Sequence, residues 1–278
     1  MNSEKTLRLG LIGRDISYSL SPRIHQWGLV TLGLYGEYRL YDIKADEIPS
    51  LLRSSEWDGL NVTVPHKTLV AGLCNILTEE ARLSQSVNVL FRREGKIWGN
   101  TTDGKGFLCA LNRLVEHPIS VRRVLIIGSG GAARAVLLSL GRHSAIEHVV
   151  VASRNPEQTE RNLALMKANC TVVSLEQAAS ELIEYDLVVQ ATPVGSAQVQ
   201  GLPLPQPFRF APIAHVMDLI YSPRKTEFLR LAESNGCRVQ NGLLMLIGQA
   251  AASFKLWTNI PFPLERAMKE LLPELEVA

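Results

Sequence analysis

The sequence has no large excess of charge of either sign. It contains 29 lysines and arginines against 27 aspartates and glutamates, which gives a formal net charge of +2 over 278 residues. It also lacks a cluster of basic residues interleaved with aromatic residues. Proteins that bind nucleic acids usually carry such a basic footprint, so the composition argues against a nucleic-acid partner.

Long hydrophobic runs are missing as well. The longest apolar stretch near the C-terminus, Gly242–Phe254, contains Gln249 and is too short to span a bilayer. The first residues, Met1–Arg8, are too polar for a secretory signal peptide. We therefore expect no membrane partner and a cytoplasmic location.

Cysteine is scarce and unpatterned. The four cysteines, at positions 74, 109, 170 and 237, include no C-x-x-C pair. We expect them to be isolated thiols, so that neither a metal site nor a disulfide framework is predicted. Internal repeats and low-complexity segments are also absent. In contrast, 46% of the residues are hydrophobic, which is enough for a substantial core, and the length suggests about two domains.

The chain does contain a glycine-rich turn between an apolar strand and a helix. Four apolar residues, Val124–Ile127, lead into Gly128, and Gly128, Gly130 and Ala133 fit the pattern G-x-G-x-x-G/A. Glycines in this pattern permit a tight turn and let backbone N–H groups approach a pyrophosphate, which the N-terminus of the following helix also attracts. The segment predicts a dinucleotide-binding Rossmann unit.

The end of the next expected strand bears on the choice of cofactor. This strand, 147–152, is followed by Ser153 and Arg154. NAD sites usually place an aspartate or a glutamate here, which binds the ribose 2′-OH. A guanidinium instead suits a 2′-phosphate, which it can bind in a bidentate manner. NADP is therefore favoured over NAD, and a solvated arginine is the alternative interpretation.

Strands alternate with helices along the rest of the chain, which predicts an α/β fold with mainly parallel sheets. In the first part the expected strands are 7–13, 37–43, 59–64, 87–91 and 96–99, and the expected helices begin at Ser21 or cover 45–55 and 66–73. The Rossmann part is expected to have strands at 122–127, 147–152, 171–173, 186–190 and 215–219, and helices at 132–140, 157–168, 175–183 and 226–235. Further helices are expected at 104–115 and 243–257.

Polar residues gather near the ends of the strands in the first part of the chain. They are Ser19 and Ser21, then Asn61, Thr63 and Lys67, then Thr101, Thr102 and Asp103. Ligands of open α/β sheets bind outside the carboxyl ends of the strands. The hydroxyls, amide, ammonium and carboxylate suit a small polyhydroxylated acid. Lys67 and Asp103 can form a charged pair that passes a proton to or from a reacting oxygen.

Several of these residues also have a structural interpretation. Ser21 is a good N-cap for the helix that it begins, and Asp103 can cap the next helix. Lys67 at a helix start is electrostatically unfavourable, which weakens an explanation of this residue as surface only. His66 can serve as a general base, although a histidine beside a proline turn is more often structural, and the same holds for His25.

Taken in order, these segments resemble the shikimate dehydrogenase family, including its quinate/shikimate dehydrogenase branch, and the similarity covers nearly the whole chain. The matching segments are Ser19–His25 (S-x-S-P-x-x-H), Gly59–Lys67 (G-x-N-V-T-x-P-x-K), Ser86–Asn88 (A-V-N), Gly128–Arg134 (the glycine loop), Ser153-Arg154 (N-R-T), Ala191–Gly195 (A-T-P-x-G), Asp218–Pro223 (D-x-x-Y-x-P) and Gly242–Gln249 (G-x-x-M-L-x-x-Q). The ordered set is far more specific than any single motif.

The resemblance implies an oxidoreductase that uses NADP to interconvert 3-dehydroshikimate and shikimate in aromatic amino-acid (chorismate) biosynthesis, with Lys67 and Asp103 as the catalytic pair. The implied substrate-binding residues are Ser19, Ser21, Asn61, Thr63, Lys67, Asn88, Asp103, Tyr221 and Gln249. The implied cofactor-binding residues are Gly128, Ser129, Gly130, Gly131, Ala132, Ser153, Arg154, Thr192, Pro193, Gly195 and Leu219.

The expected organisation is a substrate-binding domain of residues 1–103 and 241–278 and an NADP-binding Rossmann domain of residues 104–240. The helix expected at 243–257 then returns to the first domain. The expected partner is the small-molecule substrate, and we expect a monomer or a homodimer.

The chain departs from the family pattern at several positions. Thr101 replaces the asparagine of N-T-D, the segment Ser86–Val89 replaces A-V-N-T, and Ser196 stands where the family often has methionine. These departures leave open a related substrate, such as quinate, an aminoshikimate or another cyclic hydroxy acid, and also a non-catalytic ligand-sensing role. The intact Lys67 and Asp103 count against a sensor, because a pure sensor needs no proton-transfer pair.

Overall fold

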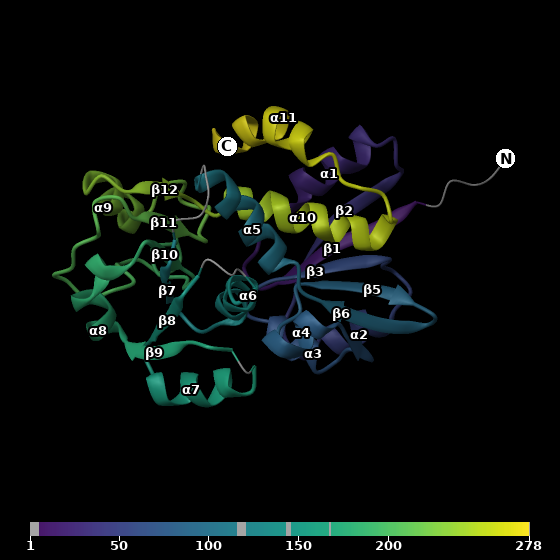
Figure 1. Ribbon diagram of the computed structural model, residues 1–278. Coiled ribbons are helices and arrows are strands. Elements are labelled where there is room, and N and C mark those ends of the chain that lie inside the picture. The colour runs from purple at the N-terminus through teal and green to yellow at the C-terminus, as the bar shows by residue number, and fades with distance from the viewer. Residues whose placement is uncertain (1–5, 116–120, 143–145, 167, 278) are drawn as a thin grey trace. The chain divides into compact units, whose positions relative to one another are not determined.

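The computed structural model describes residues 6–115, 121–142, 146–166 and 168–277 (Figure 1). The chain divides into two compact units, of which unit 1 comprises Met1–Gly106 and Leu246–Ala278 and unit 2 comprises Phe107–Met245. The divisions fall within two helices, α5 (Asp103–Leu114) and α10 (Leu243–Thr258), which therefore connect the units. Residues 1–5 of the polar N-terminal segment, and residue 167 of the helix expected at 157–168, lie outside the described residues.

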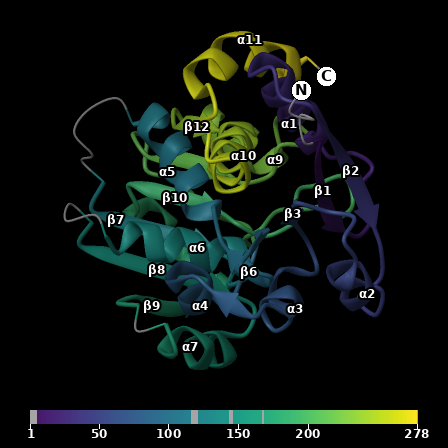
Figure 2. The ribbon, with the colours of Figure 1, turned by 90° about the vertical axis from the view of Figure 1, so that its right-hand side faces the viewer.

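Unit 1 is built on a six-stranded sheet with the order β2-β1-β3-β5-β6-β4 (Figure 1, Figure 2). Its strands are β1 (Leu7–Gly13), β2 (Gly36–Asp42), β3 (Gly59–Val62), β4 (Ile76–Leu77), β5 (Val89–Arg93) and β6 (Lys96–Asn100). β5 runs antiparallel to both of its neighbours, whereas the other pairs are parallel. As a result β1, β3 and β6 have their carboxyl ends at the same edge of the sheet.

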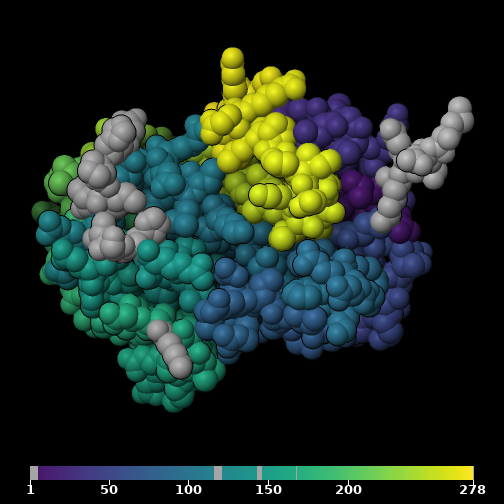
Figure 3. All heavy atoms as spheres, turned by 45° about the vertical axis from the view of Figure 1, so that its right-hand side comes forward, coloured from purple at the N-terminus to yellow at the C-terminus, as the bar shows by residue number. Residues whose placement is uncertain are grey.

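The remaining helices of unit 1 come from both ends of the chain. They are α1 (Ser21–Thr31), α2 (Ile48–Arg53), α3 (Lys67–Ala71), α4 (Glu79–Ser84) and α11 (Leu264–Glu276). Figure 3 shows α11, in yellow, beside α1, and residues of both helices line one open hollow of about 590 Å³. β4, α4 and α11 were not predicted from the sequence, and α2 and α3 are shorter than the helices predicted there.

The start of α1 corrects one expectation. Ser21 is the first residue of the helix, but Leu20 occupies the N-cap position and no side chain caps the helix. The backbone N–H of Ser21 instead donates to Oγ of Ser19 at 3.2 Å. This turn brings Ser21 into the helix itself, so its expected role as N-cap is wrong.

The side chain of Trp257 packs helix α10 closely against the sheet of unit 1. A Cβ on Gly59 of β3 would lie 2.4 Å from Cδ1 of Trp257, so the indole occupies the room that a side chain at position 59 would need. Nε1 of Trp257 donates to the carbonyl of Leu90 in β5 at 2.9 Å. The C-terminal part of α10 therefore has a defined position against β3 and β5.

Unit 2 contains a second six-stranded sheet, in which every neighbouring pair is parallel, with the order β12-β11-β10-β7-β8-β9. Its strands are β7 (Arg123–Ile127), β8 (His148–Ser153), β9 (Thr171–Ser174), β10 (Leu187–Gln190), β11 (His215–Asp218) and β12 (Arg238–Gln240). Its other helices are α6 (Gly131–Leu140), α7 (Pro156–Ala164), α8 (Leu175–Ser180), the short 3-10 helix η1 (Leu182–Glu184) and α9 (Glu227–Ser234).

This order confirms the predicted Rossmann fold. Counted within the unit it is 3-2-1-4-5-6, and the order reverses between β7 and β10, which is where such sheets bind dinucleotides. Buried residues of β7, β8, β10 and β11 form the hydrophobic core, together with Phe228 of α9 and Tyr185. β12 was not predicted from the sequence, and α7 ends at Ala164, before the end of the helix predicted at 157–168.

Candidate active site

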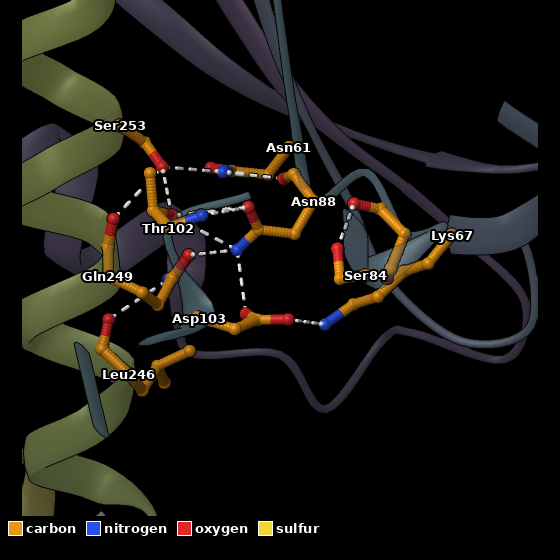
Figure 4. Close-up of polar contacts among 10 residues, drawn as sticks. Asn61, Lys67, Ser84, Asn88, Thr102, Asp103, Leu246, Gln249 and Ser253 are labelled. Carbon is orange, nitrogen blue, oxygen red and sulfur yellow. Dashed lines mark hydrogen bonds and ion pairs between the residues drawn. The ribbon is translucent and has the colours of Figure 1, made fainter. Parts of the chain in front are cut away.

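Two oppositely charged residues of unit 1 meet at the carboxyl edge of its sheet (Figure 4). Lys67 begins α3, shortly after β3, and Asp103 begins α5, shortly after β6. Nζ of Lys67 lies 2.5 Å from Oδ2 of Asp103, and the two side chains are 17% and 6% exposed. The predicted charged pair therefore forms, although 36 residues separate its members in sequence.

The other carboxylate oxygen of Asp103 is held by an amide. Nδ2 of Asn88 donates to Oδ1 of Asp103 at 2.7 Å, and it also lies 3.2 Å from Oε1 of Gln249 on α10. Oδ1 of Asn88 accepts from the backbone N–H of Thr102 at 2.7 Å. Four of the sequence-predicted substrate residues, Lys67, Asn88, Asp103 and Gln249, thus belong to one contiguous polar group. The carboxylate of Asp103 is bound by the side chains of Lys67 and Asn88, which favours a role beyond capping α5.

Asn61 joins the same group from β3, but its amide is already engaged. Its Oδ1 accepts from the hydroxyl of Tyr38 at 2.8 Å, and its Nδ2 donates to the carbonyl of Asn88 at 3.1 Å and to Oγ of Ser253 at 3.0 Å. Tyr38 and Ser253 were not among the residues predicted from the sequence. A signal for Ser253 was present, because residues four apart on a helix share a face and Gln249 lies four residues earlier.

Three predicted substrate residues lie at the same edge without joining this network. Ser19 and Ser21 follow β1, and Thr63 follows β3, the parallel neighbour of β1. Thr63 binds the end of β1 through its backbone N–H, which donates to the carbonyl of Ile12 at 2.8 Å. Among the described residues, none of the three hydroxyls is hydrogen bonded to Lys67 or Asp103.

The two histidines that the sequence analysis considered are buried and structural. Nε2 of His66 is 3.0 Å from the carbonyl of Ile43, so the ring fixes a loop rather than facing the charged pair. The ring of His25 stacks on Tyr38 with centroids 4.4 Å apart. Burial lowers the pKa of His25 to about 3, so this ring is neutral at ordinary pH.

In unit 2 the glycine-rich turn has the geometry that the pattern requires. Gly128 follows β7 with a φ of +110°, and a Cβ there would lie 2.8 Å from Cγ2 of Thr192. Gly130 has no atom within 4 Å of its ideal Cβ position, so its backbone is accessible to a ligand. Helix α6 begins at Gly131 without a side-chain cap, which leaves its first N–H groups available to an anion.

The end of β8 lies beside this turn. Oγ of Ser153 is 2.8 Å from Oγ1 of Thr159, which also bonds Oγ of Ser129 at 3.3 Å. Ser129 and Ser153 are therefore linked through one hydroxyl. Arg154, the next residue, is exposed, as a group that binds a charged phosphate must be in the free protein.

The remaining predicted cofactor residues lie in two loops, one after β10 and one after β11. The buried side chain of Gln190 shapes the loop after β10. Oε1 of Gln190 accepts from the N–H of Thr192 at 2.6 Å, while its Nε2 donates to the carbonyls of Thr192 and Val194 at 3.0 and 2.8 Å. These bonds fold the segment that contains Pro193 and precedes Gly195. Gln190 was not among the residues predicted from the sequence.

Asp218 has the corresponding place at the end of β11. Its Oδ1 accepts from the N–H of Ile220 at 3.0 Å, and its Oδ2 accepts from Oγ1 of Thr226 at 2.7 Å. Burial raises the pKa of this carboxyl to about 6. The loop that it shapes begins with Leu219 and includes Tyr221, which belongs to unit 2 and is half-buried.

The residues of unit 2 fit a dinucleotide. The open space over Gly130, the uncapped start of α6 and the exposed guanidinium of Arg154 offer binding groups for a pyrophosphate and a 2′-phosphate. The described residues contain no group of three or more side chains that could hold a metal ion. They also contain no helix with the length and apolar character that crossing a membrane requires.

The Rossmann fold of unit 2 and the lysine–aspartate pair of unit 1 define the class as a two-unit α/β protein of the nicotinamide-dependent dehydrogenase type. Family models agree with this class along the chain. Residues 11–90 match the shikimate dehydrogenase substrate binding domain, and residues 242–272 match the shikimate 5'-dehydrogenase C-terminal domain. Residues 124–199 match the saccharopine dehydrogenase NADP binding domain.

Whole proteins are similar to this chain over almost their full length. The shikimate dehydrogenase (NADP(+)) of Geobacillus kaustophilus is 35% identical, across 95% of this chain and 97% of that protein. The enzyme of the same name from Pyrococcus abyssi is 39% identical, across 90% and 92%. The crystal structure of shikimate 5-dehydrogenase from Thermus thermophilus in complex with NADP(H) and shikimate superposes with a TM-score of 0.85 at 32% identity, and covers 97% of this chain and 100% of that one. The chain therefore belongs to the shikimate dehydrogenase family.

Proposed function

We propose that the protein is an NADP-dependent shikimate dehydrogenase, which interconverts shikimate and 3-dehydroshikimate in aromatic amino-acid (chorismate) biosynthesis. The observation that carries the proposal is the 2.5 Å pair of Lys67 and Asp103 at the carboxyl edge of the sheet in unit 1. Membership in the family supports it, because relatives named shikimate dehydrogenase (NADP(+)) match over nearly the whole chain.

The charged pair suits the proton transfer that this reaction needs. When a ketone is reduced, negative charge develops on its oxygen, and the ammonium of Lys67 can stabilise that charge and donate a proton. In the direction of oxidation the amine takes the proton of the hydroxyl. Asp103 holds Lys67 in place and can orient the reacting hydroxyl, while Asn88 fixes the carboxylate from the other side.

The remaining polar residues of unit 1 suit the rest of the substrate. The hydroxyls of Ser19 and Ser21, next to the start of α1, are proposed to bind the substrate carboxylate. Ring hydroxyls are assigned to Asn88 and Asp103, with Thr63 and Gln249 nearby and Tyr221 contributed by unit 2. Asn61, whose amide is already engaged, is proposed to complete the substrate site beside Asn88.

Unit 2 is proposed as the NADP-binding domain and unit 1 as the substrate-binding domain. The nicotinamide of NADP accepts or gives the hydride. The residues proposed to hold the cofactor are Gly128, Ser129, Gly130, Gly131, Ala132, Ser153, Arg154, Thr192, Pro193, Gly195 and Leu219. We also propose a cytoplasmic location and a monomer or homodimer, which cell fractionation and light scattering would test.

The direct test is the formation of NADPH, followed by its absorbance, when purified protein is mixed with NADP and either shikimate, quinate or no acid. We expect turnover with shikimate, little with quinate and none without an acid. Faster turnover with quinate would assign the protein to the quinate branch. Ligand binding without turnover of either acid would favour the sensor instead.

A further inference from the structure

Ser253 is a buried hydroxyl that the proposed reaction does not use. It is 0% exposed and lies on α10, four residues after Gln249. Figure 4 shows its side chain turned towards Asn61 of β3 and Thr102, which precedes α5. Its Oγ lies 3.0 Å from Nδ2 of Asn61 and 3.1 Å from Oγ1 of Thr102. One hydroxyl on the last part of the chain thus meets two segments that carry site residues.

The direction of each hydrogen bond follows from counting protons. A serine hydroxyl has one proton and two lone pairs. Ser253 donates its proton to the carbonyl of Gln249 at 2.9 Å, because a carbonyl can only accept. The amide nitrogen of Asn61 can only donate to Oγ of Ser253. The bond between the two hydroxyls must therefore run from Thr102 to Ser253.

This direction determines what Thr102 can offer to Asn88. Once its proton points to Ser253, Oγ1 of Thr102 serves as an acceptor, and Nδ2 of Asn88 donates to it at 3.0 Å. The second proton of Nδ2 goes to Oδ1 of Asp103 at 2.7 Å, which is closer than the other acceptor on that side, Oε1 of Gln249 at 3.2 Å. Oδ1 of Asn88, at 3.2 Å, competes with Oγ of Ser253, at 3.1 Å, for the single proton of the Thr102 hydroxyl. Without Ser253, Oδ1 of Asn88 is the acceptor that remains of these two.

We propose that Ser253 is a positioning residue for the reaction, which acts through Thr102 to fix the amide of Asn88 and, through it, the carboxylate of Asp103. The inference rests on the proposed function, since it assigns Asp103 to the chemistry. Ser253 itself touches neither Lys67 nor Asp103 among its hydrogen bonds in the described residues. It differs from Gln249, which contacts Asn88 directly.

The test uses Ser253→Ala, Thr102→Val and the double variant in steady-state kinetics with shikimate and NADP. We expect Ser253→Ala to lower kcat/KM for shikimate about tenfold, the effect of one buried hydrogen bond lost. The KM for NADP should stay unchanged. Thr102→Ser should keep nearly full activity, because it retains the hydroxyl that the proposal requires. A role of Thr102 in filling space alone would not require that hydroxyl.

The matched control is Ser139→Ala in α6 of unit 2. Oγ of Ser139 also donates to a carbonyl four residues earlier, that of Ala135 at 2.9 Å. It has the same helical bond as Ser253 without the link to Thr102. We expect this variant to leave the kinetics with shikimate unchanged, so a loss confined to Ser253→Ala is not a general effect of removing a helical serine hydroxyl.

The double variant decides whether the two hydroxyls act as one chain. If they do, adding Ser253→Ala to Thr102→Val has little further effect, whereas independent roles give multiplied losses and overturn the proposal. Full kcat/KM in folded Ser253→Ala also overturns it while the proposed function stands. If wild-type protein turns over no acid, the function fails instead. In that case the same double-mutant cycle, measured as changes in the free energy of unfolding, tests whether the two hydroxyls act as one chain. Additive changes in that free energy would refute the proposal.

Discussion

Both units place buried polar side chains at the ends of strands, but they use them differently. In unit 1 the side chains bind one another, from Lys67 through Asp103 to Asn88. In unit 2, Gln190 and Asp218 bind mainly backbone groups of the loops that follow their strands. In the proposed function the first arrangement positions the reacting groups, whereas the second gives loops a fixed shape. Damage to unit 1 should therefore lower turnover, whereas damage to unit 2 should weaken the binding of NADP.

The largest effect is expected from Lys67→Ala. If Lys67 acts only in the transition state, kcat should fall by about 10²–10⁴-fold, the usual contribution of a positioned acid–base group, while KM for shikimate changes much less. Steady-state kinetics with shikimate and NADP measure both values, and circular dichroism checks folding.

The control for this variant is Lys96→Ala, which removes an exposed lysine from the hairpin of unit 1. Its kinetics should equal those of the wild type. Near-normal turnover in folded Lys67→Ala would remove Lys67 from the mechanism.

The next effect concerns the choice of cofactor in unit 2. Arg154→Ala should raise KM for NADP by roughly 10- to 100-fold, which is the range for a hydrogen bond to a charged group. KM for NAD should change little, because only NADP carries the 2′-phosphate. Arg230→Ala, an exposed arginine on α9, is the control. Equal changes for the two cofactors would show that Arg154 does not recognise the phosphate.

A smaller effect is expected when the loop after β10 loses its support. Gln190→Leu keeps the bulk but removes the bonds to Thr192 and Val194, so KM for NADP should rise about tenfold. The kcat for shikimate at saturating NADP should fall less than in Lys67→Ala. Gln177→Leu, at an exposed position on α8, is the matched control. Unchanged KM for NADP would leave the loop without a role in binding the cofactor.

The last effect is on stability rather than on kinetics, and it depends on pH. The folded pKa of Asp218 is raised to about 6 from 3.8, so between these values the native state holds a proton that the unfolded state has lost. The contribution of Asp218 to the free energy of unfolding is therefore largest below about pH 4 and falls as pH rises to about 6, by roughly 3 kcal/mol in total.

Urea denaturation of the wild type and of Asp218→Asn, measured from pH 4 to pH 7, tests this slope. The variant should gain stability relative to the wild type across that window, and the difference should level off above about pH 6. A constant difference at every pH would mean that Asp218 does not titrate there.

Much of the fold and part of the site could be predicted from the sequence. The apolar run before Gly128 and the motif after it predict the Rossmann unit because buried parallel strands and tight glycine turns leave strong local patterns. The meeting of Lys67 and Asp103 follows from strand ends that share an edge. By contrast, the helix that contains Pro273 was missed, because an internal proline is typical of a helix break.

The support of the site was harder to predict. The interpretation of Ser21 as a cap failed because the helix already includes Ser21, whose N–H donates to Oγ of Ser19, and such a turn leaves no sequence pattern of its own. Ser253 was missed because a single small hydroxyl on an apolar helix is consistent with packing alone. The importance of Ser253 depends on its contacts with Asn61 and Thr102, which lie far from it in the sequence.

The bond between Asn61 and Ser253 joins residues that are 192 positions apart, and the one between Asn88 and Gln249 spans 161. During synthesis on the ribosome, residues 107–245 of unit 2 emerge before the segment from Leu246 onwards that completes unit 1. Domains generally fold as units during synthesis, and distant contacts form slowly. We therefore expect unit 2 to complete its Rossmann fold before the part of α10 from Leu246 onwards packs on the sheet of unit 1. In a nascent chain that is cut short before Gln249, Asn88 would lack its contact with Gln249 and Asn61 would lack its contact with Ser253.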